Sequence, residues 1–111
     1  MGKRLKAALA QDRLVRVFCL GQLCHPKYVA IIGQHGGYDA VWLDQEHAGL
    51  SSEQIELACL AARAVGLDTF VLLAPTDYAT VMRSLEAGAG GIMAAQVKSV
   101  QEAENVLQWA K

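Results

Sequence analysis

Four consecutive polar side chains, Asp44-Gln45-Glu46-His47, stand in the middle of the stretch WLDQEHAGL. They follow a short apolar run and precede a turn of small residues, so they fall where a strand is expected to end. An imidazole can act as a general base near neutral pH, and a neighbouring carboxylate can orient the ring and stabilise its charged form. Asp44 and Glu46 can also bind a divalent cation or its coordinated waters. The alternative is a polar loop that caps the next helix and contacts solvent, and the residue types alone leave both interpretations open.

The elements that position these residues are predicted from alternating hydrophobic patterns. Short apolar runs, typical of strands, alternate with apolar residues repeated at helical spacing. Pro26 suits the first turn of a helix, and Ser51 with Gln54 has the spacing of a capping box, as does Ser99 with Glu102. We expect a helix over 3–12, strands over 14–20, 39–44, 69–73 and 91–95, and a helix after each strand.

This order of elements predicts an α/β fold built from parallel strand–helix units. The strands are near-continuous apolar runs, which is typical of strands covered on both faces. Two architectures fit: a doubly wound sheet, or four of the eight units of a (β/α)8 TIM barrel, whose complete form takes about 250 residues. In either architecture the carboxyl ends of the strands meet at one edge. Gln22 and Gln96 follow the first and last strands, so both are expected to face the same mouth as His47.

The composition limits the kinds of partner. The 111 residues are 53% hydrophobic and 19% charged with a formal net charge of −1, which indicates one compact domain and gives no basis for binding nucleic acid or an anionic membrane. No apolar run reaches the roughly 18–20 residues that span a bilayer. The N-terminal segment predicts an amphipathic helix and not a signal peptide.

Three cysteines without a CxxC pair indicate free thiols and a cytoplasmic protein. Cys19, in a strand, and Cys59, on a helix face, are expected to be buried. Cys24 lies in a candidate loop beside His25 and is the one candidate for a reactive thiol. His25 itself is either the cap of the helix that begins at Pro26 or a ligand.

Three stretches together resemble a known family. G-Y-D-A-V-W-L-D-Q-E-H-A-G-L, residues 37–50, resembles the G-[FY]-D-x-x-x-x-D-x-E-H-[AG] segment of the HpcH/HpaI aldolases. The similarity continues in register through V-L-L-A-P-T-D-Y-x-x-V-M-R-S-L-E-A-G-A-G-G-I-M and V-K-S-V-Q-E-A-E. The combination of D-x-E-H with a downstream L-[DE]-x-G-A is much more specific than a lone glycine motif.

The resemblance implies a fold and an activity. HpcH/HpaI aldolases are (β/α)8 barrels and typically class II aldolases of the 4-hydroxy-2-oxoheptane-1,7-dioate aldolase kind, which act on pyruvate or related 2-oxo acids together with an aldehyde. Residues 1–111 are then the N-terminal half of a single TIM-barrel domain, with the first four strand–helix units after an N-terminal helix. A divalent metal, Mg²⁺, Mn²⁺ or Co²⁺, polarises the 2-oxo acid as a Lewis acid. Its protein ligands are expected downstream of Lys111, and a homo-oligomer is expected.

The resemblance also implies roles for individual residues. The histidine of D-x-E-H, here His47, takes part in proton transfer, and the acidic residue of L-[DE]-x-G-A, here Glu86, supports it. Asp44 and Glu46 match the remaining acids, which order the site and the metal-bound water, and Glu46 is not expected to bind the metal directly. Gln22, Leu73 and Gln96 are the expected substrate-binding positions.

The sequence departs from the family pattern in ways that matter. Leu73 stands where the family has an arginine that contacts the substrate oxygen, and the loss of such a donor can cost about 2.7–4 kcal/mol of transition-state stabilisation. Glu86 replaces the usual aspartate. A non-catalytic relative with a binding or assembly role is therefore the alternative, as is a related carbon–carbon lyase with a different acid. Four parallel strands alone leave open edges, so we expect residues 1–111 in isolation to be unstable or self-associating, and inactive.

Overall fold

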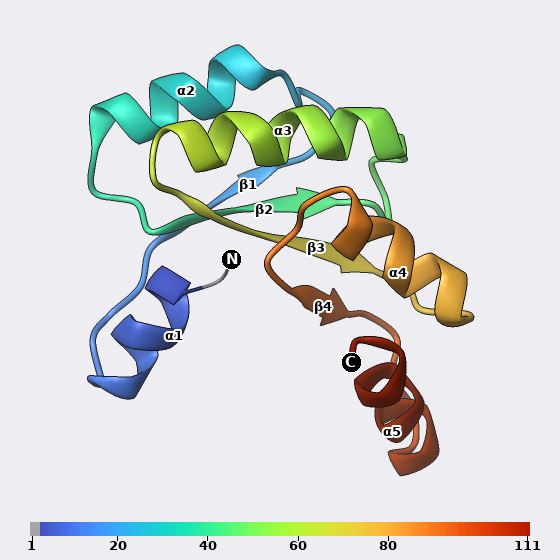
Figure 1. Cartoon of the computed structure of the whole chain (residues 1–111). Coiled ribbons are helices and arrows are strands. Elements are labelled where there is room, and N and C mark those ends of the chain that lie inside the picture. Colours follow the sequence, from blue (N-terminus) through green and yellow to red (C-terminus); the bar gives the residue numbers. More distant parts are fainter. Residues whose placement is uncertain (1–2) are drawn as a thin grey trace.

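The computed structural model describes residues 3–111 as an α/β fold with a parallel, four-stranded sheet (Figure 1). Each strand is followed by a helix, and one further helix precedes the first strand. The predicted order of elements is confirmed. The elements are α1 (Lys3–Ala10), β1 (Val17–Leu20), α2 (Pro26–His35), β2 (Ala40–Asp44), α3 (Ser52–Ala64), β3 (Asp68–Leu73), α4 (Tyr78–Glu86), β4 (Ile92–Ala94) and α5 (Val100–Trp109).

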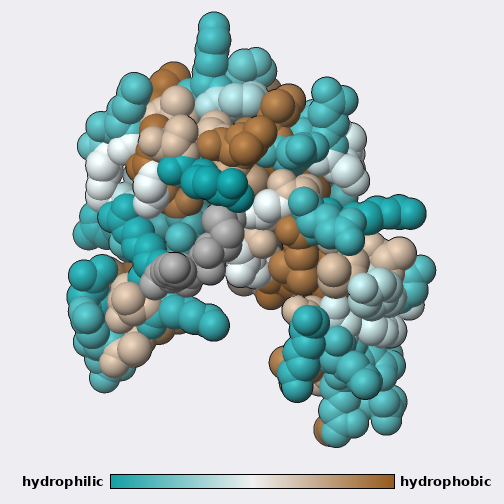
Figure 2. Space-filling view, viewed as in Figure 1, coloured by the Kyte–Doolittle hydropathy of each residue, from teal (hydrophilic) through white to brown (hydrophobic). Residues whose placement is uncertain are grey.

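The strands lie in the sheet in the order in which they occur along the chain, β1-β2-β3-β4. All three pairings are parallel, with Ala40 opposite Val17 and Asp68, and Asp44 opposite Leu72. Helices α2 and α3 cover one face of the sheet, while α1 and α5 extend past its other side (Figure 1). Figure 2 shows the molecule hollowed between these two helices. One face of the sheet is therefore covered and the other is open.

The hydrophobic core lies between the sheet and the helices that cover it. Strand residues alternate between the two faces, so the core takes every second residue of β2 and β3. Helices α2, α3 and α4 contribute the apolar positions that recur at helical spacing. The buried core residues of these elements include Val29, Ile32, Val41, Leu43, Ile55, Ala58, Cys59, Ala62, Val71, Leu73 and Val81.

The predicted helix starts are confirmed. His25 precedes α2 as its cap, and its Nδ1 accepts a hydrogen bond from the Lys27 amide at 3.0 Å. The hydroxyl of Ser51 accepts from the Gln54 amide at 3.1 Å, and the Gln54 side chain accepts from the Ser51 amide at 2.8 Å. These bonds satisfy amides that have no partner inside the helix. Of the two interpretations of His25, the structure therefore supports the cap.

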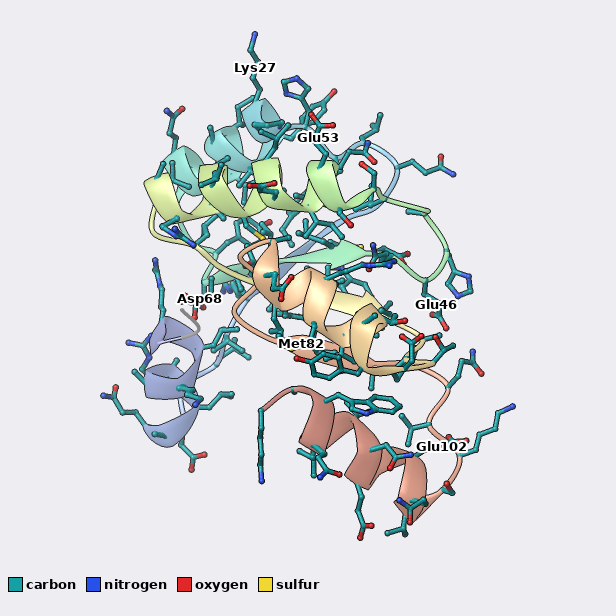
Figure 3. The ribbon with its side chains drawn as sticks, turned by 45° about the vertical axis from the view of Figure 1, so that its right-hand side comes forward. Lys27, Glu46, Glu53, Asp68, Met82 and Glu102 are labelled. Atoms are coloured by element: carbon teal, nitrogen blue, oxygen red, sulfur yellow. The ribbon has the colours of Figure 1, made fainter. Side chains whose placement is uncertain are left out.

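Helix α1 is fixed at the edge of the sheet where the strands begin. The Arg4 guanidinium lies 3.3 Å from the Asp39 carboxylate, and the Leu5 amide donates to Asp68 at 2.8 Å. Figure 3 shows Asp68 beside this helix, far from Glu46 at the other end of the sheet. The helix ends at Ala10 and not at residue 12, because Asp12 adopts a φ of 57°, which a right-handed helix does not allow.

The expectation that every strand is covered on both faces is wrong for the two edge strands: Met93 of β4 is exposed, and β1 is the clearer case. Val17, Phe18 and Cys19 are exposed, and the strand begins at Val17 and not at residue 14. The cause is the position of β1 at the edge of the sheet, where only β2 pairs with it. Cys19 is therefore exposed, although burial was predicted. Cys59 is buried, as predicted. Among the helices of residues 3–111, none combines the length and apolar character needed to cross a membrane.

Candidate active site

The loop that follows β2 takes its shape from Asp44. This aspartate is the last residue of the strand, and its Oδ1 accepts hydrogen bonds from the amides of Glu46, at 2.9 Å, and His47, at 3.0 Å. An aspartate that binds the backbone two and three residues ahead forms a tight Asx-type turn. Asp44 therefore acts on the neighbouring side chains by fixing the backbone that carries them.

The side chains of Glu46 and His47 are paired at the carboxyl ends of the strands. The His47 Nε2 lies 3.0 Å from the Glu46 Oε1, and the two side chains are 75% and 13% exposed. The other carboxylate oxygen, Oε2, accepts a hydrogen bond from the Gln96 amide group at 3.3 Å. Gln96 follows β4 and has a φ of 61°, a backbone conformation that is uncommon outside glycine. Glu46 thus connects the ends of β2 and β4 and contacts the exposed imidazole of His47.

This arrangement suits proton transfer. When the Nε2–H group donates to Glu46, the lone pair of Nδ1 is free to accept a proton from a bound molecule. The carboxylate then stabilises the imidazolium that forms. A carboxylate does lie beside the His47 ring, and it belongs to Glu46. That it orients the ring for proton transfer stays a prediction.

The structure does not bring Glu86 to His47. Glu86 is the exposed last residue of α4, which runs back from the mouth toward the start of β4. A helix in a parallel strand–helix unit is antiparallel to its strand, so its last residue lies toward the opposite edge of the sheet. Within the described residues, the acid paired with His47 is Glu46. The supporting role of Glu86 stays a prediction, and the contacts within this chain do not support it.

Neither Leu73 nor Gln22 forms a side-chain hydrogen bond with Glu46 or His47, although Leu73 lines the same cavity as Glu46. Leu73 ends β3 on the face that packs against the helices, and it is 2% exposed because it shares that face with Val71. Its position makes it an apolar wall of the core and not an open contact for substrate. Gln22 follows β1, is exposed, and lines an apolar cavity of about 660 Å³ between β1 and α2. Of the three expected substrate-binding positions, only Gln96 contacts the Glu46–His47 pair.

The described residues do not form a complete metal centre by themselves. No three acidic, histidine or cysteine side chains converge on one point between Lys3 and Lys111. Both oxygens of Glu46 already have partners, and the Oδ1 of Asp44 accepts two amides. A divalent metal at this mouth would need ligands from elsewhere, and their position downstream of Lys111 stays a prediction.

Ser84 was not singled out by the sequence, and Gln45 was named without a role of its own, although these two residues connect the loop to the helix layer. The Ser84 hydroxyl, on α4, donates to the Gln45 Oε1 at 3.3 Å, and the Gln45 Nε2 donates to the Leu50 carbonyl at 3.2 Å. Ser84 is 1% exposed. The signal was present, because Ser84 is a polar residue three positions after Val81, on the buried stripe of an amphipathic helix.

The pKa values of the three cysteine thiols do not favour the reactive thiolate form. Burial is the main cause that raises the pKa of Cys59, of Cys24 and of Cys19 above the ordinary thiol value. The thiolate is the reactive form of cysteine, so a raised pKa lowers reactivity at neutral pH. The reactive-thiol interpretation of Cys24 is therefore not supported.

Comparison with known proteins gives one consistent group of relatives. No family model matches the chain. Hydroxypyruvate/pyruvate aldolase of Rhizorhabdus wittichii is 33% identical over 69 residues, which are 62% of this chain and 28% of the relative. The crystal structure of an HpcH/HpaI aldolase from Desulfitobacterium hafniense has a TM-score of 0.89 at 29% identity, over 96% of this chain and 41% of that one. Citrate synthase SbnG has a TM-score of 0.83 at 25% identity, over 93% and 41%.

The chain spans well under half the length of the relatives it matches. Over that span, sequence and fold agree: the D-Q-E-H segment ends the second strand of a parallel sheet that is shared with a solved HpcH/HpaI aldolase. The family resemblance read from the sequence is confirmed. Sequence and structure together support an HpcH/HpaI-like aldolase family for this chain, and its partial coverage of its relatives fits a match to their N-terminal portion.

Proposed function

We propose that this chain is part of a metal-dependent carbon–carbon lyase that cleaves a 4-hydroxy-2-oxo acid into pyruvate and an aldehyde, and catalyses the reverse addition. The observation that carries the proposal is the Glu46–His47 pair at the carboxyl ends of the strands, in a fold shared with an aldolase. Active sites of parallel α/β folds lie at this edge.

We infer that residues 1–111 are the N-terminal half of one (β/α)8 barrel. The strands follow one another without the reversal of order that defines a doubly wound sheet, as in a barrel. Strands β1 and β4 are both edge strands, and the apolar side chains near them are exposed, including Phe18 and Met93. Four further strand–helix units would pair both edges and cover these side chains.

The chain's own residues would handle the proton. In cleavage, a base takes the proton of the 4-hydroxyl, the C3–C4 bond breaks, and its electron pair passes to C3, which is protonated to become the pyruvate methyl group. We assign proton transfer to His47, orientation of its ring to Glu46, and the shape of the loop to Asp44. Gln96 holds the Glu46 carboxylate and can contact the substrate. A bound Mg²⁺, Mn²⁺ or Co²⁺ would supply Lewis-acid activation of the 2-oxo acid.

The test is pyruvate release by the natural full-length protein. The protein is incubated with 4-hydroxy-2-oxo acids, with and without a divalent metal, and pyruvate is measured. We expect release that a chelator abolishes and that added metal restores. Absence of release with every metal and acid tried, in a folded protein, would contradict the proposal.

A second candidate is a non-catalytic relative that binds a 2-oxo acid or has a role in assembly. Leu73 favours it, because a buried leucine supplies no hydrogen bond to a substrate. Calorimetry separates the two candidates: pyruvate binding in the presence of metal, without turnover, would favour the second. For either candidate we propose a cytoplasmic homo-oligomer, and size-exclusion chromatography with light scattering tests the oligomer.

A further inference from the structure

Gln45 is the variable residue of the D-x-E-H segment, and it binds three separate parts of the molecule. Its backbone amide donates to the Leu72 carbonyl at 2.8 Å, which extends the pairing of β2 with β3. Its side chain donates to the Leu50 carbonyl, ahead of α3, and accepts from the Ser84 hydroxyl on α4. The loop is therefore tied to the sheet, to its own far end and to the helix layer through one residue.

A cavity beside Gln45 makes the position of the loop depend on the hydrogen bonds of that residue. A cavity of about 210 Å³ lies next to the loop and is lined by Gln45, Glu46, Ser52, Leu73, Ala74, Thr80 and Arg83. Side chains that border a cavity are not held there by close packing. The position of the loop must then depend on its hydrogen bonds. The bond to Ser84 connects the loop to α4, which lines the opposite side of the cavity.

Ser84 is suited to act as the fixed end of this link. Its side chain is almost fully buried on α4, and within the described residues every buried side-chain nitrogen or oxygen has a hydrogen-bond partner. A buried hydroxyl that loses its acceptor destabilises the protein, so the state in which Ser84 and Gln45 are hydrogen-bonded is favoured. Ser84 therefore holds Gln45 in one place.

We propose that Gln45, held by Ser84, is a positioning residue that fixes Glu46 and His47 relative to the mouth of the sheet. The inference rests on the proposed function, because it assigns Gln45 an effect on proton transfer through His47. Gln45 itself contacts neither His47 nor Glu46 by a side-chain hydrogen bond in the structure.

The experiment uses the natural full-length protein with four variants: Ser84→Ala, Gln45→Leu, the double variant, and Ser52→Ala. Ser52 is the matched control because it is an exposed serine that lines the same cavity from α3. Two observations are made: kcat and KM for exchange of the pyruvate methyl protons with deuterium, and the NMR chemical shifts of the His47 imidazole.

We expect each of the two single changes at the link to lower kcat by roughly tenfold, less than the ~100-fold that a 1 Å misplacement can cost, with little change in KM. The double variant should resemble the single ones, because both remove the same link. The chemical shifts of the His47 imidazole should change in all three, and Ser52→Ala should leave both the kinetics and these shifts unchanged. If Gln45→Leu does not fold, Gln45→Glu keeps an acceptor for Ser84 and should show a smaller decrease in kcat.

Two results would overturn the inference, and they can be told apart from failure of the proposed function. If the wild type exchanges protons and Ser84→Ala behaves like Ser52→Ala, the link has no positioning role. If the wild type exchanges no protons, the proposed function fails and the His47 chemical shifts decide alone. Shifts that change in Ser84→Ala but not in Ser52→Ala would then support the link, and unchanged shifts would overturn it.

Discussion

Strands β1 and β2 are neighbours in one sheet, yet only β2 ends in an organised loop. Strand β2 is paired on both sides, and the loop after it contains the Asp44 turn, the Glu46–His47 pair and the Gln45–Ser84 bond. Strand β1 is paired on one side and is largely exposed, and Gln22, two residues after its end, lines an apolar cavity of about 660 Å³.

The difference shows that the site is organised by its neighbours as much as by its own residues. The loop after β2 receives its hydrogen bonds from later elements, with Leu72 in β3, Ser84 in α4 and Gln96 after β4. No described element lies on the far side of β1 in the sheet. We therefore expect the end of β1 to become ordered only when further strand–helix units pack beside it.

Paired alanine substitutions in the two strands test that expectation most strongly. Leu43 is fully buried in β2, and Phe18 in β1 is half-exposed, with its ring edge-to-face on Tyr38 at 5.5 Å. In the natural full-length protein we expect Leu43→Ala and Phe18→Ala each to lower the free energy of unfolding by about 2–5 kcal/mol, because further units would cover Phe18. Urea unfolding measures both. A Phe18→Ala variant as stable as the wild type would contradict the closed barrel.

Two glycine substitutions sharpen the contrast between the covered and the open side. A Cβ on Gly33, in α2, would overlap the side chain of Val65, which follows α3, whereas nothing lies within 4 Å of a Cβ on Gly21, after β1. We expect Gly33→Ala to lower the free energy of unfolding by about 1–3 kcal/mol, since an added methyl group forces the helices apart. Gly21→Ala should cost less by the same urea measurement. Equal costs would mean that the end of β1 is as closely packed as the helix layer.

A pair of acid substitutions tests which carboxylate supports His47. We expect Glu46→Gln to lower the rate of aldol cleavage by about 10–100-fold, as for carboxylate partners of other functional histidines, because the ring loses its charged partner. Glu86→Gln should have little effect, since Glu86 is exposed at the end of α4. The opposite result, loss with Glu86→Gln alone, would show that the family resemblance assigns this role correctly and that Glu86 reaches a site which this chain does not form alone.

The smallest effect on stability is expected at Asp77, which caps the start of α4 at the carboxyl-terminal end of the sheet. The Asp77 carboxylate accepts from the Thr80 hydroxyl at 2.6 Å and from its amide at 2.8 Å, and these bonds hold the pKa of Asp77 below its ordinary value. A pKa lowered by folding contributes stability above the unfolded-state value, near 3.8, and the contribution is lost as the pH falls through the folded value.

Asp77→Asn removes this titration and keeps a cap. The free energy of unfolding of the wild type, relative to Asp77→Asn, should therefore be constant near neutral pH and should decrease slightly below about pH 4. Urea unfolding from pH 6 to pH 3 measures the difference. A difference that grows as the pH falls would contradict the assigned direction.

Much of the fold could be predicted because it depends on local patterns. The Ser51–Gln54 capping box, the Pro26 helix start and the apolar strands are short-range signals. The capping box, the helix start and the strand order appear as expected, although the first strand begins at Val17 and not at residue 14. The exposure of Cys19 could not be predicted, because an apolar run does not reveal whether a neighbouring strand is present.

The site was predictable only in part, for a related reason. The motif located His47 and its acids, but the partner of His47 is decided by backbone geometry, and the Asp44 turn brings Glu46 to it. The face on which Leu73 lies depends on strand register, since a shift of one residue reverses it. The Gln45–Ser84 pair joins residues 39 positions apart, which no local pattern indicates.

The most direct test of the account compares two histidines from the two regions. His47 is paired with Glu46 at the end of β2, and His35 is an exposed residue beside the apolar cavity of β1. Exchange of the pyruvate methyl protons with deuterium is measured in the natural full-length protein with a divalent metal present, for His47→Ala and for His35→Ala. The account predicts a decrease of about 10²–10⁴-fold for His47→Ala and almost none for His35→Ala. Exchange at the wild-type rate in His47→Ala would contradict it.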